Sequence, residues 1–113
     1  MVRRQTVVET PAFLSAAKGV LSEQERKALV DLLASHPQSG ASLGGGIRKL
    51  RIPRAGRGKS GGARVVFLFA DESLPIFLLT VFAKNEKANL TQSEQARLIS
   101  MAKQMITSYR SRK

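Results

Sequence analysis

Cysteine and tryptophan are absent from this chain of 113 residues, and histidine and tyrosine occur once each. Without cysteine the chain can form neither disulfide bonds nor thiolate metal sites, which suits a protein of the reducing cytoplasm. The one histidine, His36, precedes Pro37 in an expected loop, where we expect a surface side chain. A serine–histidine triad and a histidine–cysteine metal site are therefore not expected, and we predict a protein without metal or cofactor.

Long apolar segments are also missing. No stretch approaches the roughly 18 apolar residues that a membrane-spanning helix needs, so we expect no membrane segment. The first residues, Met1-Val2-Arg3-Arg4, lead into Glu9 without the apolar core of a signal peptide. We therefore expect a cytoplasmic protein. With 42 % apolar residues the chain can build the core of one domain, residues 1–113.

Acidic residues are few, and this shortage is the most informative one. Eight Asp and Glu face 19 Lys and Arg, which leaves a net charge of +11. No acidic residue lies between residues 48 and 64, where glycines interrupt a run of cations: Arg48, Lys49, Arg51, Arg54, Arg57, Lys59 and Arg64. Positive charge this dense repels itself unless an anion relieves it. We infer a polyphosphate partner, nucleic acid above all, with RNA chemistry as the sharper hypothesis.

Helix starts and apolar runs predict the order of the elements. Thr10-Pro11 and the capping boxes Ser22–Glu25 and Thr91–Glu94 each predict the start of a helix. The expected strands cover 5–9, 47–52, 63–70 and 76–82, and 36–46 and 53–62 are expected loops. This order, β-α-α-β-β-β-α, predicts an α+β domain with a small antiparallel sheet packed against helices.

A nucleotide-triphosphate loop is suggested by Gly58-Lys59-Ser60 and is then excluded. The pattern requires glycine where Pro53 stands, and a helix where the next strand begins. Asp71 and Glu72, which form the one adjacent pair of carboxylates, fall in an expected turn and are read as solvated. The residues left for chemistry are cationic.

Cations from three expected strands should converge. Lys49 and Arg51 share a face of one strand, Arg64 opens the next, and Lys84 ends the third. If these strands are consecutive and antiparallel, Arg51, Arg64 and Lys84 lie at one end of the sheet, and several cations would meet there. Guanidinium groups match phosphate oxygens, fixed cations stabilise developing negative charge, and a lysine among cations can transfer protons. Such a site could cleave RNA without a metal; a phosphate-binding surface without chemistry is the alternative.

Three segments resemble the RelE/HigB toxins of bacterial toxin–antitoxin modules, and the HigB branch above all. They are Gly45-Gly46-Ile47-Arg48-Lys49-Leu50-Arg51, the run GRGKSGGARVV from Gly56 to Val66, and Phe82-Ala83-Lys84-Asn85-Glu86-Lys87 with Leu90-Thr91. The resemblance covers nearly the whole chain. It implies a microbial-RNase-like α+β fold and a ribosome-dependent mRNA endonuclease that cuts the codon in the ribosomal A site and inhibits translation. It also implies a cognate antitoxin, often with a helix-turn-helix domain, through which alone operator DNA is contacted.

The resemblance also implies a role for each matching position. Lys49 is assigned to proton transfer and Arg51 to phosphate binding. Arg64 is assigned to stabilising the pentacoordinate phosphate, and Lys84 is the candidate acid. The cations expected to bind RNA without taking part in the chemistry are Arg48, Arg54, Arg57, Lys59 and Lys87. The pattern leaves open which lysine is the base and which the acid, as well as codon preference, antitoxin identity and oligomeric state.

Two departures from the family pattern keep other functions open. Family members often carry tyrosine where this chain has Phe67, Phe69 and Phe82. The only tyrosine, Tyr109, falls on the apolar stripe of the last helix, where we expect core packing. Two interpretations follow: a lysine carries the proton transfer in place of tyrosine, or the chain is a weak or inactive relative. The alternatives are a ParE-like poison of DNA gyrase on the same fold and a non-catalytic RNA- or DNA-binding module.

Overall fold

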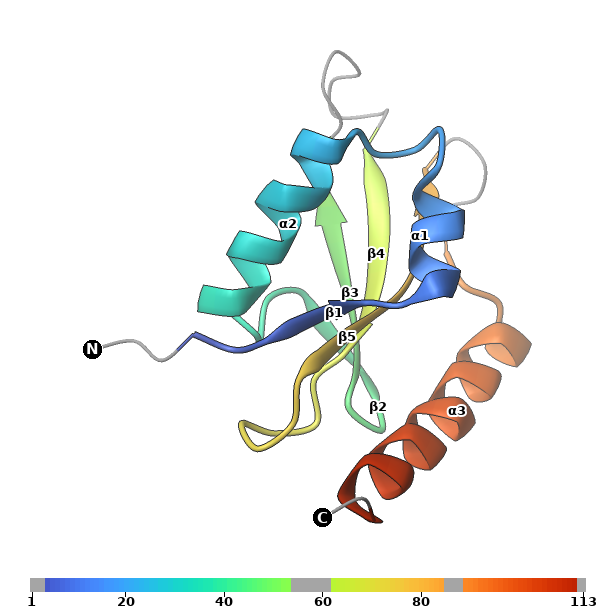
Figure 1. The fold of residues 1–113 in the computed structure, drawn as a ribbon. Coiled ribbons are helices and arrows are strands. Elements are labelled where there is room, and N and C mark those ends of the chain that lie inside the picture. The colour runs from blue at the N-terminus through green and yellow to red at the C-terminus, as the bar shows by residue number, and fades with distance from the viewer. Residues whose placement is uncertain (1–3, 54–61, 85–88, 112–113) are drawn as a thin grey trace.

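A computed structural model of the chain describes residues 4–53, 62–84 and 89–111 (Figure 1). Within these ranges five strands form one sheet and three helices pack on it. In chain order the elements are β1 (Val7–Glu9), α1 (Pro11–Ala17), α2 (Glu23–Ser35), β2 (Ala41–Gly44), β3 (Ile47–Ile52), β4 (Ala63–Leu68), β5 (Ile76–Ala83) and α3 (Gln92–Ser111). The predicted α+β class is confirmed.

The sheet runs in the order β1-β5-β4-β3-β2, so β3, β4 and β5 are the consecutive antiparallel strands that the sequence predicted. Two details differ from the expectation. β1 pairs with β5 in parallel, which makes the sheet mixed. The expected loop 36–46 contains the additional strand β2, which pairs with β3. The β2 sequence Ala-Ser-Leu-Gly has no apolar alternation, so the pairing with β3, rather than local propensity, makes it a strand.

The helices begin at the caps that the sequence predicts. α1 follows Thr10, whose side chain accepts a hydrogen bond from the first turn. Ser22 and Glu25 form both bonds of a capping box at the start of α2, at 3.1 and 2.8 Å. Thr91 and Glu94 do the same at the start of α3, at 3.0 and 2.9 Å. These bonds satisfy backbone N–H groups that a helix leaves unpaired, and they fix the point at which α3 begins.

Helices cover both faces of the sheet (Figure 1). On one face Phe13 of α1 and Leu33 of α2 belong to a fully buried core with Phe67 of β4. On the other face Ala102 of α3 belongs to a second core with Val66, the neighbour of Phe67 on β4. Because both faces are covered, β4 is buried along its whole length, as its nearly unbroken apolar run predicted.

α3 is attached to its face by a narrow stripe. Of its 20 residues only Ala102 is buried, and Leu98, Ile99, Met105 and Ile106 are partly buried beside it. None of the described helices is long and apolar enough to cross a membrane.

Gly40 fixes the path of the loop between α2 and β2, next to the backbone of β3. Its φ of +79° is a left-handed conformation that glycine adopts without strain, and a Cβ there would lie 2.2 Å from the backbone oxygen of Lys49. Only glycine meets both conditions. The loop between α2 and β2 can therefore pack directly against the backbone of the strand that carries two of the predicted catalytic residues.

Candidate functional site

The strand register brings predicted catalytic residues from three strands to one end of the sheet. Arg51 of β3 lies directly opposite Arg64 of β4, and Arg64 lies directly opposite Phe82 of β5. The backbone N–H of Lys84 donates to the Gly62 carbonyl at 2.9 Å, so the ladder continues past the end of β5. Arg51, Arg64 and Lys84 therefore occupy neighbouring positions on consecutive strands.

Alternation along the strands places the four cations on the face that carries α3. Ile47, Lys49 and Arg51 share one face of β3, and Ile47 packs in the core beneath α3. Lys84 lies two residues beyond the direct partner of Arg64 and so keeps to the same face. Directly opposed side chains on one face have Cβ atoms about 4.5–5.5 Å apart. The register thus places Arg51 beside Arg64, with Lys84 at the same end of the sheet, while the convergence of the four side chains on one phosphate and their catalytic roles stay predictions. We call these four residues the cationic face.

Arg64 is the one charged side chain that is buried among the described residues, with 7 % of its surface exposed. Its Nη1 has no hydrogen-bond acceptor in the part of the chain that the structure describes. Burial first, and the charge of Arg51 second, lower the pKa of the Arg64 guanidinium, which still stays protonated near neutral pH. A buried cation with an open donor and a second cation beside it is unfavourable in isolation, and an anion placed there relieves both conditions.

Lys49 is held by a residue that the sequence analysis missed. Its Nζ donates to Asn89 Oδ1 at 3.0 Å, across 40 positions of the chain. Asn89 lies two residues before Thr91, the cap of α3. The signal that could have found it is an amide between the end of a predicted strand and a predicted helix cap, where the chain passes the end of the sheet. Within the described residues, the side chain of Lys84 makes no comparable bond.

Arg48 points away from the cationic face, as the alternation along β3 predicted. Its Nε donates to the Ser39 carbonyl at 3.1 Å, and its Nη2 donates to the carbonyls of Gln38 and Gly40 at 2.8 and 3.0 Å. These bonds hold the loop between α2 and β2 against β3. The predicted role of Arg48 in RNA binding stays a prediction, although two of its three nitrogens already have backbone partners.

Four further cations were predicted to bind RNA. Arg54, Arg57, Lys59 and Lys87 lie outside the described residues, and so do most of the expected basic loop 53–62 and part of the segment after β5. The ion pairs formed by described residues join Arg4 to Asp31, Arg26 to Glu9 and Arg110 to Asp71. None of them includes a residue of the cationic face.

The acidic pair and the histidine lie where the sequence predicted. Asp71 accepts hydrogen bonds from the hydroxyl and the N–H of Ser73 in the turn between β4 and β5, and these bonds, the hydroxyl's first, lower the pKa of its carboxyl. Glu72 is exposed in the same turn, and His36 is exposed at the C-terminal end of α2. No three acidic or histidine side chains lie together as metal ligands anywhere in the described ranges.

The aromatic residues take structural places. Phe67 is fully buried in the core under α1 and α2, Phe82 is buried under α3, and Phe69 is partly buried. Tyr109 packs edge-to-face on Phe77, with ring centroids 6.2 Å apart and an interplanar angle of 72°. This contact is the packing that the helical stripe predicted for Tyr109.

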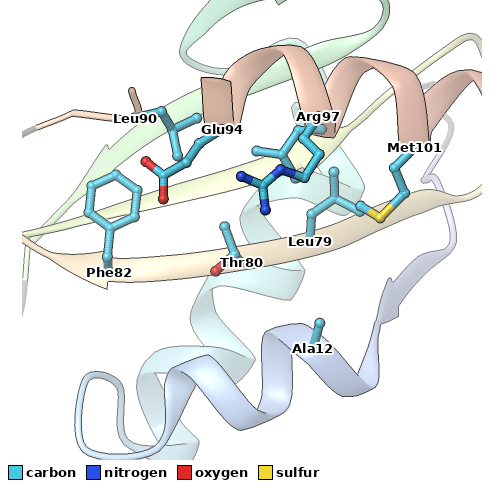
Figure 2. Close-up of a pocket in the computed structure, with 9 residues that line it drawn as sticks. Ala12, Leu79, Thr80, Phe82, Leu90, Glu94, Arg97 and Met101 are labelled. Carbon is cyan, nitrogen blue, oxygen red and sulfur yellow. The ribbon is translucent and has the colours of Figure 1, made fainter. Parts of the chain in front are cut away.

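An apolar groove of about 390 Å³ begins beside the cationic face. Figure 2 shows Leu79 and Thr80 of β5 beneath Arg97 and Met101 of α3, and Phe82 of β5 near Leu90 and Glu94. Ala12 of α1 also lines the space. Phe82 is the cross-strand partner of Arg64, so groove and cations adjoin. The sequence did not predict this groove, because it depends on how far α3 stands from the edge of the sheet.

Comparisons with known proteins agree with the fold. A mutant of the E. coli toxin RelE, solved in the free state, is similar in structure with a TM-score of 0.58 and 17 % sequence identity, over 85 % of this chain and 98 % of that one. At this identity the likeness concerns the fold. The family model described as "RelE toxin of RelE / RelB toxin-antitoxin system" matches residues 9–112. Since that match spans nearly the whole chain, the protein belongs to the RelE toxin family of RelE/RelB toxin–antitoxin systems.

Proposed function

We propose that this toxin is a ribosome-dependent endoribonuclease that cleaves mRNA in the ribosomal A site and so inhibits translation. Family membership supports the toxin assignment. The observation that carries the nuclease assignment is the buried guanidinium of Arg64, which lies beside Arg51 and has an open Nη1 donor. A surface that only attracts RNA can do so with exposed cations, whereas a fixed and desolvated cation is suited to stabilising charge that develops during a reaction.

In the proposed reaction the 2′-oxygen of one nucleotide attacks the adjacent phosphorus. The bond from phosphorus to the 5′-oxygen breaks, which leaves a 2′,3′-cyclic phosphate and a 5′-hydroxyl. Lys49 accepts the proton of the 2′-hydroxyl, and Lys84 delivers a proton to the departing 5′-oxygen. Arg51 binds a non-bridging oxygen, and Arg64 stabilises the extra negative charge on the pentacoordinate phosphorus. The step needs no metal and no cofactor.

The family implies a cognate antitoxin, and we propose that it carries a helix-turn-helix domain and contacts the operator DNA, so that the toxin reaches DNA only through it. We place the toxin in the cytoplasm, where its ribosomes and mRNA are. Neutralisation then requires that the antitoxin keep the cationic face from the ribosome, either by covering it or by adding bulk beside it. A net charge of +11 favours an acidic antitoxin surface.

The test is an incubation of the purified toxin with translating ribosomes on a defined mRNA, followed by mapping of the mRNA ends. We expect cleavage within the A-site codon, and a loss of about 10²- to 10³-fold in rate for Arg64→Ala. The matched control is Arg110→Ala, which removes an exposed arginine at the far end of α3. The control should cleave at the parent rate.

Two results would contradict the proposal. Equal cleavage by the parent and by Arg64→Ala would move the site away from the cationic face. Intact mRNA together with stalled DNA gyrase would favour the gyrase-poison alternative. Growth arrest that both substitutions leave unchanged would also count against a nuclease centred on Arg64.

A further inference from the structure

The bond between Lys49 and Asn89 joins the catalytic strand to the start of α3. Lys49 lies in the middle of β3, and Asn89 lies in the segment between β5 and α3. The capping box that begins at Thr91, two residues later, anchors this segment through two hydrogen bonds, at 2.9 and 3.0 Å. The backbone that carries Asn89 is therefore anchored close to the point where its side chain contacts Lys49.

The polarity of the bond is set by chemistry. The ammonium form of lysine can only donate, and the neutral amine that accepts the 2′-proton keeps its lone pair for that proton and donates through an N–H, so in both forms the group of Asn89 that faces it is the amide oxygen. The contact of 3.0 Å uses one N–H of Nζ and leaves the others for a substrate. A lysine side chain has four rotatable bonds, and without a partner it samples many conformations in which Nζ is far from the phosphate. A single acceptor at the correct place removes most of them.

We propose that Asn89 is a positioning residue that holds Nζ of Lys49 in the reactive place over the scissile phosphate. This inference rests on the proposed nuclease function and adds to it an asymmetry between the two lysines. Lys49 is held by a second segment of the chain, whereas the side chain of Lys84 has no such partner among the described residues. Proton transfer at the 2′-oxygen, which needs close alignment, is therefore assigned to the held lysine.

The first test compares two replacements of similar size. Asn89→Leu removes the acceptor, and we expect kcat to fall about 10- to 100-fold while KM for programmed ribosomes changes less than about twofold. Asn89→Asp keeps an oxygen acceptor at the same place but adds a negative charge to a phosphate-binding face, so KM should rise and kcat should fall less than in Asn89→Leu. Gln92→Leu is the matched control, because it removes another exposed amide three residues later, and it should behave as the parent.

The second test asks whether Asn89 acts through Lys49. In the background of Lys49→Met, the additional change Asn89→Leu should lower the rate by less than about twofold, because the lysine that it positions is gone. A residue that merely supports the fold would lower both rates by the same factor. Equal factors in the two backgrounds, or parent-like cleavage by Asn89→Leu, would overturn the inference.

A third measurement does not depend on catalysis. In nitrogen-15 NMR spectra of the lysine ammonium groups, the Lys49 resonance should be protected from exchange with water in the parent and in Asn89→Asp, and should be lost in Asn89→Leu. If the parent toxin cleaves no mRNA, the proposed function fails while this spectrum still decides whether Asn89 holds Lys49. A Lys49 resonance that is equally unprotected in all three proteins would contradict the inference.

Discussion

The two faces of the sheet differ in what they leave uncovered. Beneath α1 and α2 the larger apolar core includes Phe13, Leu33 and Val81. Beneath α3 a smaller apolar core includes Ala102 and Phe82, and the same face of the sheet carries the four cations. We infer that one face supplies most of the stability, and that the other can therefore tolerate a buried cation such as Arg64, whose Nη1 has no acceptor among the described residues.

The largest effect expected from this comparison is on folding. Leu33 is fully buried in α2, and Leu98 is partly buried in α3, so the same change can be made on both faces. Leu33→Ala should lower the free energy of unfolding by about 2–5 kcal/mol, because it removes contacts that cannot be replaced. Leu98→Ala should lower it by only about 1 kcal/mol, since part of that side chain already meets water. Urea unfolding followed by circular dichroism measures both.

Equal losses at the two leucines would show that α3 contributes as much to the core as α1 and α2 do. A change in the slope of the unfolding free energy with urea would instead report a change in the unfolded state, and for that reason midpoint and slope are both compared.

The next effect separates two arginines on opposite faces. Arg64→Met should reduce mRNA cleavage by about 10²- to 10³-fold and leave the melting temperature equal or higher, because it removes a buried charge whose Nη1 has no acceptor in the described structure. Arg48→Met should lower the stability and leave mRNA cleavage unchanged. It deprives three backbone carbonyls of their donor, which costs about 1–3 kcal/mol of stability, while the cationic face stays complete.

The distinction between the two faces is wrong if Arg48→Met loses cleavage and Arg64→Met loses stability. Loss of cleavage in Arg48→Met at unchanged stability would restore the RNA-binding role that the sequence suggested for Arg48. A large fall in the melting temperature of Arg64→Met would show that the guanidinium stabilises the sheet, rather than serving as a phosphate-binding group.

The sequence predicted those parts of the molecule that depend on short-range rules. Capping residues such as Ser22 and Thr91 predicted the helix starts, and consecutive apolar runs predicted the strands that bring Arg51 and Arg64 to one end of the sheet. It did not predict β2, whose pairing arises from β3, or the contact of Asn89, which lies 40 positions from Lys49. Both depend on the route of the chain between elements, which residue patterns do not encode locally.

The smallest effect concerns the far end of the α3 face. Asp71, in the turn between β4 and β5, accepts from Ser73 and pairs with Arg110 of α3, and these contacts, the Ser73 hydroxyl first, lower the pKa of its carboxyl. A carboxyl whose pKa is lowered by folding stabilises the protein above the ordinary carboxyl range, and that contribution is lost as the pH falls through the lowered pKa. The parent should therefore melt slightly above Asp71→Asn at neutral pH, and the difference should vanish in strong acid.

Salt separates the two causes of this difference. High ionic strength screens the exposed pair with Arg110 but leaves the short-range bonds from Ser73. Most of the neutral-pH difference should therefore survive in concentrated salt. If salt abolishes it, the charge of Arg110 is the main cause, and the C-terminal end of α3 is held to the sheet by electrostatics rather than by the turn; in that case Arg110→Ala would reproduce the melting behaviour of Asp71→Asn.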